Sequence, residues 1–130
     1  MKYLLDVNAL IALGLEFHAL HSRVALWINS EPHSSYLTCS ITELGFVRVI
    51  AQVPAYGTDV QDARKLLLRL KQNKTIPIEF IADTGDISSL PQWVKTPAQT
   101  TDGHLVQLAR THNAVLATLD KGIPGAYLIP

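Results

Sequence analysis

The sequence predicts a protein of the α/β class, in which helices cover a mainly parallel sheet as an α/β sandwich. Short apolar segments typical of strands alternate along the chain with segments of helical periodicity, as in sheets whose parallel strands are joined by helices. The 130 residues suffice for one hydrophobic core. With 48% hydrophobic and only 17% charged residues, the chain has the composition of a compact globular protein. We therefore expect residues 1–130 to form one domain.

The first element is a short apolar strand at the N-terminus that stops at Asp6. A helix over about residues 8–16 follows, and its apolar residues 9–13 should pack on the strand. Asp6 then falls at the carboxyl end of the strand, where open parallel sheets bind their ligands. A simpler alternative is that Asp6 or Asn8 only caps the helix.

A second helix is predicted over about residues 19–30, and its core-facing residues are expected to be Ala25, Trp27 and Ile28. His18 and His21 stand three residues apart near its start, a spacing that can hold a metal ion. No third nitrogen or sulfur ligand accompanies them, so we interpret both as polar residues at a helix start.

After a loop over residues 31–35, residues 36–39 predict a second strand, and a third helix should run from Ser40 to the residue before Pro54. Its apolar positions with helical spacing are Ile41, Leu44, Val47 and Ala51. Ser40-x-x-Glu43 also has the pattern of a capping box. Glu43 therefore has a purely structural alternative, in which its side chain turns back onto the start of the helix.

The fourth helix should begin at Thr58, because Thr58-x-x-Gln61 is a second capping-box pattern. An apolar stripe at helical spacing predicts its core face; the stripe consists of Ala63, Leu66, Leu67 and Leu70. Five basic residues lie in the same short segment, at Arg64, Lys65, Arg69, Lys71 and Lys74. They form either an ordinary solvated face or the one candidate phosphate-contacting surface of a neutral protein.

The last part of the chain contains three further predicted strands and one long helix. Residues 76–81 indicate an edge strand because of Pro77, and residues 83–100 indicate irregular structure with one helical turn. A helix should start at Thr101 and end near Asn113. Its expected inner face consists of Leu105, Leu108, Ala109 and His112. Residues 114–119 predict a buried strand, and residues 127–129 a final one.

Charge and composition limit the function classes. The 11 basic and 11 acidic residues balance, so binding of nucleic acid would need a local basic face or a metal-loaded site. The single cysteine, Cys39, has no partner for an internal disulfide and is expected to be buried. Asp6 and Asn8 interrupt the N-terminal apolar run, and no apolar stretch is long enough to span a membrane. We expect a cytoplasmic protein.

Four carboxylates are predicted to share one edge of the sheet. Asp6 and Asp120 each follow the end of a strand. Glu43 lies in the first turn of a helix that leaves a strand, and Asp102 in the first turn of the helix that leads to the strand before Asp120. Because each crossover helix starts where its preceding strand ends, these positions meet at the carboxyl edge.

Four neighbouring carboxylates would repel one another unless a cation joined them. Oxygen ligands without clustered histidines or cysteines suit Mg²⁺ or Mn²⁺ and do not suit zinc. Such a centre would bind an anionic substrate through the metal ion, and phosphate esters are the obvious class.

The motifs around these carboxylates resemble those of PIN-domain ribonucleases, most closely the VapC toxins of bacterial toxin–antitoxin pairs. The resemblance extends over residues 2–123. It rests on Asp6-Val7-Asn8, Ser40-x-x-Glu43-Leu44, Thr42-Glu43-x-x-Phe46-x-Arg48-Val49, Thr101-Asp102 and Ala117-Thr118-Leu119-Asp120. It implies a PIN-like three-layer α/β/α sandwich and Mg²⁺-dependent hydrolysis of RNA, with Mn²⁺ as an alternative ion. The chain departs from the family pattern at Gly103, where alanine is commoner, and in residues 83–100.

The resemblance places the family's catalytic and metal-binding carboxylates at Asp6, Glu43, Asp102 and Asp120. Among them, Asp6 and Asp120 are expected to be the principal metal ligands, and Glu43 and Asp102 to complete the metal's ligand shell or position the water. Asn8 matches the polar residue beside the first aspartate, and Thr118 the hydroxyl residue before the last. Arg48 lies one turn beyond Glu43, where it either orients a carboxylate or is an ordinary surface arginine. Arg64, Lys65 and Arg69 are the candidate RNA contacts.

Two other functions remain open at this point. A phosphatase with an aspartate nucleophile needs a second carboxylate two residues later, but this chain has Asn8 there. A non-catalytic RNA- or protein-binding module is the other alternative, and the retention of all four acidic positions argues against it.

The resemblance also implies partners. They are the RNA substrate, an antitoxin whose tail places an arginine among the carboxylates, and a second copy of the chain in a homodimer.

Overall fold

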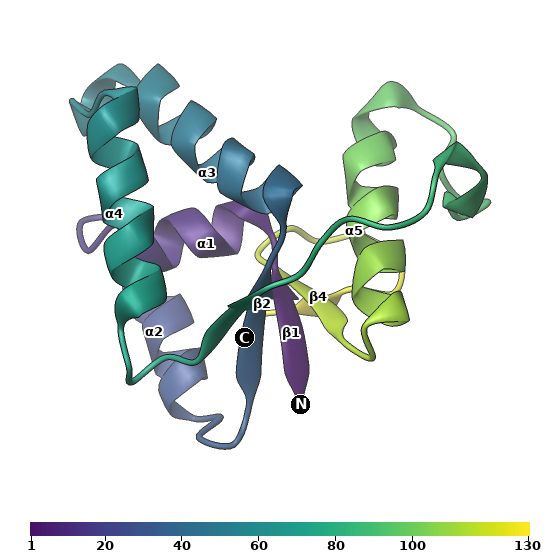
Figure 1. Cartoon of the computed structure of the whole chain (residues 1–130), viewed down its shortest axis with the longest axis horizontal. Helices are drawn as coiled ribbons and strands as arrows, with labels where there is room; N and C mark the ends of the chain where they lie inside the picture. Colours follow the sequence, from purple (N-terminus) through teal and green to yellow (C-terminus); the bar gives the residue numbers. More distant parts are fainter.

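The computed structural model describes residues 1–130, and a five-stranded parallel sheet in the order β3-β2-β1-β4-β5 lies at its centre (Figure 1). The strands are β1 (Lys2–Leu5), β2 (Ser35–Thr38), β3 (Ile78–Phe80), β4 (Val115–Thr118) and β5 (Tyr127–Leu128). The helices are α1 (Val7–Gly14), α2 (His21–Asn29), α3 (Ser40–Gln52), α4 (Val60–Gln72) and α5 (Thr100–Thr111). Short 3₁₀ helices occupy Pro54–Tyr56, Ile87–Ser89 and Pro97–Gln99. The predicted α/β sandwich with a parallel sheet is confirmed.

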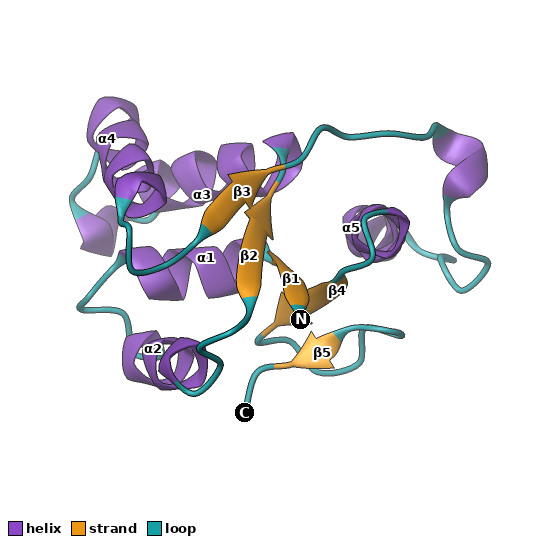
Figure 2. Ribbon diagram, turned by 60° about the horizontal axis from the view of Figure 1, so that its bottom comes forward, coloured by secondary structure: helices purple, strands orange, loops and turns teal.

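Helices cover both faces of the sheet. Figure 2 shows α1 to α4 on one side and α5 on the other, which makes three layers. The strands β1 and β4 are central, and their residues alternate between the two faces. Tyr3 and Leu5 belong to the core under α1 to α4, whereas Leu4 belongs to the core under α5. This alternation explains why the β1 segment reads as a continuous apolar run.

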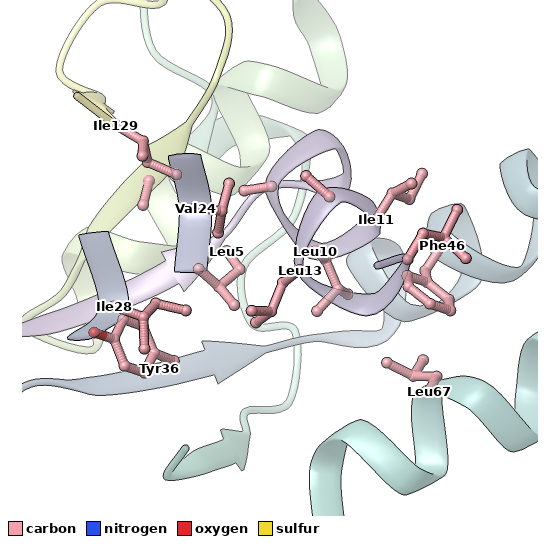
Figure 3. Packing of buried hydrophobic residues seen from close by; sticks show 14 of the residues in the cluster. Leu5, Leu10, Ile11, Leu13, Val24, Ile28, Tyr36, Phe46, Leu67 and Ile129 are labelled. Atoms are coloured by element: carbon pink, nitrogen blue, oxygen red, sulfur yellow. The ribbon is translucent and has the colours of Figure 1, made fainter. Parts of the chain in front are cut away.

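The larger core lies between the sheet and α1, which is apolar on nearly all sides. Residues 9–13 of α1 are all buried. Figure 3 shows Leu10 and Leu13 next to Leu5 of the sheet, with Phe46 of α3 and Leu67 of α4 at the outer end of the cluster. The helix α1 is therefore enclosed by the sheet and by its three neighbouring helices, as its composition predicts.

The face that α3 buries differs from the prediction. Its buried side chains include Thr42, Phe46 and Ile50, spaced i, i+4, i+8, whereas Leu44 is 66% exposed. The sequence offers apolar residues on two adjacent stripes of this helix, so spacing alone does not select between them. Phe46 supplies the largest side chain of the stripe that faces α1, and this stripe is the one that is buried.

The capping box offered as an alternative at α3 and the one expected at α4 do not form at the residues that the patterns indicated. At α3 the box is formed one residue earlier, where the Cys39 N–H donates to Thr42 Oγ1 at 3.0 Å. At α4 the cap is Asp59, whose Oδ1 accepts from the Asp62 N–H at 2.8 Å. The carboxylate of Glu43 takes no part in capping.

The remaining elements agree with the sequence to within a few residues. The strand β3 is an edge strand, as Pro77 indicated, and Cys39 is buried. Residues 83–100 contain two short 3₁₀ helices in place of the expected single turn. His18 accepts a hydrogen bond from the Leu20 N–H just before α2, and His21 bonds to the Ala12 carbonyl of α1. No helix combines the length and the apolar character that crossing a membrane requires.

Candidate active site at the carboxyl edge of the sheet

Asp6 follows β1 directly and is nearly enclosed, with 6% of its surface exposed. Its Oδ1 accepts a hydrogen bond from the Val7 N–H at 2.8 Å, as an N-cap of α1 does. Its Oδ2 accepts one from the Thr118 hydroxyl at 2.7 Å. The capping alternative for Asp6 is therefore real, and it accounts for only one of the two carboxylate oxygens.

Thr118 ends β4, and three side-chain and backbone groups converge on its hydroxyl. Besides donating to Asp6, Thr118 Oγ1 accepts from the Asp120 N–H at 3.1 Å and from Asn8 Nδ2 at 3.3 Å. The amide oxygen of Asn8 accepts from the Leu119 N–H at 3.1 Å. Asn8 and Thr118 thus fix the end of β4, which carries Asp120, against the start of α1.

The third carboxylate at this edge is Asp102, in the first turn of α5. Burial raises the pKa of Asp102 above its usual value, and the charge of Asp120 raises it further. The pKa of Asp6 is raised mainly by burial, against the lowering effect of its two hydrogen bonds, and the charges of Asp102 and Asp120 also raise it. These three carboxylates are therefore close enough to repel one another.

Glu43 lies at the same edge but has different neighbours. Its Oε2 accepts from the Thr38 hydroxyl at 2.6 Å and from Lys71 Nζ at 2.7 Å. The ammonium group of Lys71, from the last turns of α4, also lies 5.5 Å from the centre of the Phe80 ring. Glu43 is therefore neutralised by the protein, and the three aspartates are not.

The chemical character of the available ligands suits a divalent cation. Asp6, Asp102 and Asp120 offer only carboxylate oxygens, and no basic side chain pairs with any of them. In the side-chain positions of this structure, no three histidine, cysteine, aspartate or glutamate residues come together in an arrangement that could hold a metal ion. Neither the exposed Asp120 nor the half-buried Asp102 has a side-chain hydrogen bond, so both are free to turn toward Asp6.

Arg48 does not make the contact with a carboxylate that its position suggested. Its side chain is exposed on α3 and forms no ion pair or hydrogen bond. Lys71 occupies that place beside Glu43 instead. The sequence gives no signal for this pairing, because the partners are 28 positions apart and the whole turn from α3 to α4 lies between them.

The three candidate RNA contacts on α4 are all exposed, but they face two sides of the helix. Arg64 lines a groove of about 480 Å³ between α3 and α4, together with Glu43 and Phe80. Arg69 lines cavities on the side toward α1 and α2, and Lys65 shares one cavity with each of the other two. Of the three, only Arg64 shares a groove with a candidate catalytic carboxylate.

The two departures from the family pattern, Gly103 and residues 83–100, contact each other in the structure and form a single feature. A Cβ atom added at Gly103 would overlap Val94 Cγ2. Residues 83–100 therefore approach α5 at the one position where the helix has no side chain. Asp83 of the same segment also contacts α5, through a 3.0 Å pair with His104. The segment thus packs beside Asp102, at the margin of the candidate site.

Comparison with known proteins gives relatives over nearly the whole chain. The family model of the PIN domain matches residues 3–127. Ribonuclease VapC38 of Mycobacterium tuberculosis is 37% identical over 92% of this chain and 86% of its own length. Ribonuclease VapC44 of the same organism is 36% identical over 97% of this chain and 94% of its own length.

Solved structures share the fold at low sequence identity. The VapBC2 complex of Rickettsia felis, bound to a DNA fragment from its promoter, contains a chain with a TM-score of 0.63 and 15% identity, covering 98% of this chain and 97% of that chain. VapC20 of M. tuberculosis, a toxin that cleaves the sarcin–ricin loop, also has a TM-score of 0.63, with 12% identity and coverage of 92% and 89%.

Proposed function

The chain belongs to the PIN domain family of VapC-type ribonucleases, and we propose that it is an endoribonuclease toxin that hydrolyses RNA phosphodiester bonds with a divalent metal ion. The observation that carries the proposal is that Asp6, Asp102 and Asp120 all lie at the carboxyl edge of the sheet, without a basic partner for any of them. The relatives' names support the activity, and the oxygen-only donors support the choice of Mg²⁺ or Mn²⁺.

In this proposal Asp6, Asp102 and Asp120 would hold the ion. The ion would supply positive charge against the reacting phosphate and make water a better nucleophile at neutral pH. Thr118 and Asn8 fix Asp6 and the end of β4, so that only the side chains of Asp102 and Asp120 would turn to complete the set. Glu43, held at the same edge by two hydrogen bonds, is the carboxylate left to position the attacking water.

RNA cleavage by the purified protein tests this function. Cleavage should stop with a chelator and resume when Mg²⁺ or Mn²⁺ is added. Because water is the nucleophile, the products should carry 5′-phosphate and 3′-hydroxyl ends, and a 2′-deoxy substitution at the cleaved position should leave the bond cleavable. Products with 2′,3′-cyclic phosphate ends would contradict the mechanism, since they require attack by the RNA's own 2′-hydroxyl.

We further propose that a cognate antitoxin neutralises the enzyme. An arginine inserted among the unpaired carboxylates would bind them bidentately and compete with the metal ion. The R. felis structure that shares this fold is of VapBC2, a VapC-type chain together with a VapB partner, and this supports such a partner. Assembly as a homodimer and a cytoplasmic location belong to the same proposal. A non-catalytic binding module remains the alternative, and it predicts RNA binding without any cleavage.

A further inference from the structure

Lys71 is the only basic side chain that pairs with one of the four candidate carboxylates. Its Nζ lies 2.7 Å from Glu43 Oε2, and both side chains are largely buried, with 24% and 22% of their surfaces exposed. The ammonium group also lies against the ring of Phe80. An ammonium group that contacts both a carboxylate and an aromatic ring is held in place, unlike a lysine on a solvated helix face.

The same oxygen of Glu43 is held from a second direction by the Thr38 hydroxyl, at 2.6 Å. Two short hydrogen bonds, one from a charged donor, fix the carboxylate in one orientation. An ammonium group in contact with this carboxylate also opposes the approach of a divalent cation to it, because the two positive charges repel.

The aspartates have no such partner. The side chains of Asp6, Asp102 and Asp120 form no ion pair with a basic residue. The acidic edge therefore consists of two parts, a group of three mutually repelling aspartates and a glutamate paired with lysine.

We propose that Lys71 is a positioning residue that holds Glu43 outside the metal-binding set, so that the metal ion is bound by the three aspartates alone. Glu43 then acts on water or RNA from a position fixed by Thr38 and Lys71. This inference rests on the proposed metal-dependent nuclease function, and it assigns Glu43 a role different from that of the three aspartates.

Binding of Mn²⁺ to the metal-free protein, measured by isothermal titration calorimetry, tests the inference without relying on activity. The test variant is Lys71→Met/Glu43→Gln, which removes one positive and one negative charge and leaves the net charge unchanged. The matched control is Lys2→Met/Asp120→Asn, which is equally balanced. Lys2 is exposed at the amino edge of the sheet, opposite the site.

We expect the test variant to bind Mn²⁺ within about threefold of the wild type but to lose cleavage, whereas the control should lose about tenfold or more in affinity. Lys71→Met alone should tighten Mn²⁺ binding, because it frees Glu43. This gain should disappear when Glu43 is also changed to Gln. The variant Lys71→Gln/Glu43→Gln, which can keep a neutral hydrogen bond, repeats the test if the first variant does not fold.

A tenfold or greater loss of Mn²⁺ affinity in the folded test variant would show that Glu43 is a metal ligand. That result would overturn this inference and leave the nuclease assignment standing. A wild-type protein that neither binds Mn²⁺ nor needs it for cleavage would instead overturn the proposed function, and this inference with it.

Discussion

The hydroxyl of Thr118 donates to Asp6 Oδ2 at 2.7 Å, across 112 residues of sequence. The backbone repeats the connection, because the Asp6 N–H donates to the Ala117 carbonyl at 2.9 Å. Asp6 is thus fixed by β4, the strand that leads to Asp120. The relative placement of Asp6 and Asp120 depends on this pairing of β1 with β4.

Replacing Thr118 by valine should lower cleavage while keeping the shape of the side chain. The change leaves Asp6 Oδ2 without its donor in a nearly closed environment. We expect a loss of about 1–3 kcal/mol in the free energy of unfolding and a fall in cleavage rate of about tenfold or more. Urea denaturation and a cleavage assay measure the two effects. Thr118→Ser, which keeps the hydroxyl, is the control, and wild-type stability and cleavage in Thr118→Val would show that the hydrogen bond to Asp6 contributes little.

Gly103→Ala should destabilise the protein when residue 94 is valine and stabilise it when residue 94 is alanine. In the wild type the new Cβ would overlap Val94, and overpacking of this kind costs about 1–3 kcal/mol. In a Val94→Ala background the overlap is relieved, and alanine should then stabilise the helix by up to about 1 kcal/mol over glycine. Urea denaturation of the four proteins in this cycle measures both effects. The same sign in both backgrounds would show that residues 83–100 do not depend on Gly103.

Neutralising Arg64, Lys65 and Arg69 together should weaken RNA binding and flatten its dependence on salt. Each lost phosphate contact on single-stranded RNA should reduce the slope of log affinity against log salt by about 0.7. A matched triple variant at the exposed residues Lys2, Lys95 and Arg110 controls for the change in net charge. If the two triple variants have the same slope, the exposed face of α4 is ordinary solvated surface.

Expression of the intact protein alone should arrest bacterial growth, because the proposed enzyme would cleave the host's RNA. Asp6→Asn, expressed at the same level, should permit growth, and so should co-expression of the protein encoded by the neighbouring gene. Growth curves together with immunoblots of the soluble protein measure this. Normal growth at high levels of soluble wild-type protein would count against the toxin assignment and would leave the nuclease activity to be judged by cleavage.

The sequence predicts the sheet edge well because topology decides it. Parallel strands joined by crossovers bring Asp6, Asp102 and Asp120 together whatever the details of packing. The buried stripe of α3 was not predictable in the same way, since Leu44 and Phe46 are both apolar and only the fit against α1 selects the second. The partner of Glu43 was missed for a similar reason, because the packing of α4 on α3 determines where Lys71 reaches.

Asp6→Asn should leave the metal-free fold as stable as the wild type or more stable. Burial is the main cause that raises the pKa of Asp6 in the folded state. Because the pKa of Asp6 is higher in the folded than in the unfolded state, its stabilising contribution is fully present below the unfolded pKa and is lost as the pH rises through the folded pKa. At neutral pH the ionised carboxylate therefore weakens the fold. Thermal unfolding at neutral pH measures the difference. A clear drop in melting temperature would show that the capping bond of Asp6 outweighs its burial.

The most direct test of the central claim is the rate at which folded Asp6→Asn cleaves RNA, compared with the wild type at saturating Mg²⁺. The substitution keeps the size of the side chain and removes a charged oxygen ligand at the point where β1 and β4 meet. We predict a fall on the order of a hundredfold or more, with melting temperature preserved. Cleavage at the wild-type rate by a folded Asp6→Asn protein would contradict the account, because it would place the chemistry away from this edge of the sheet.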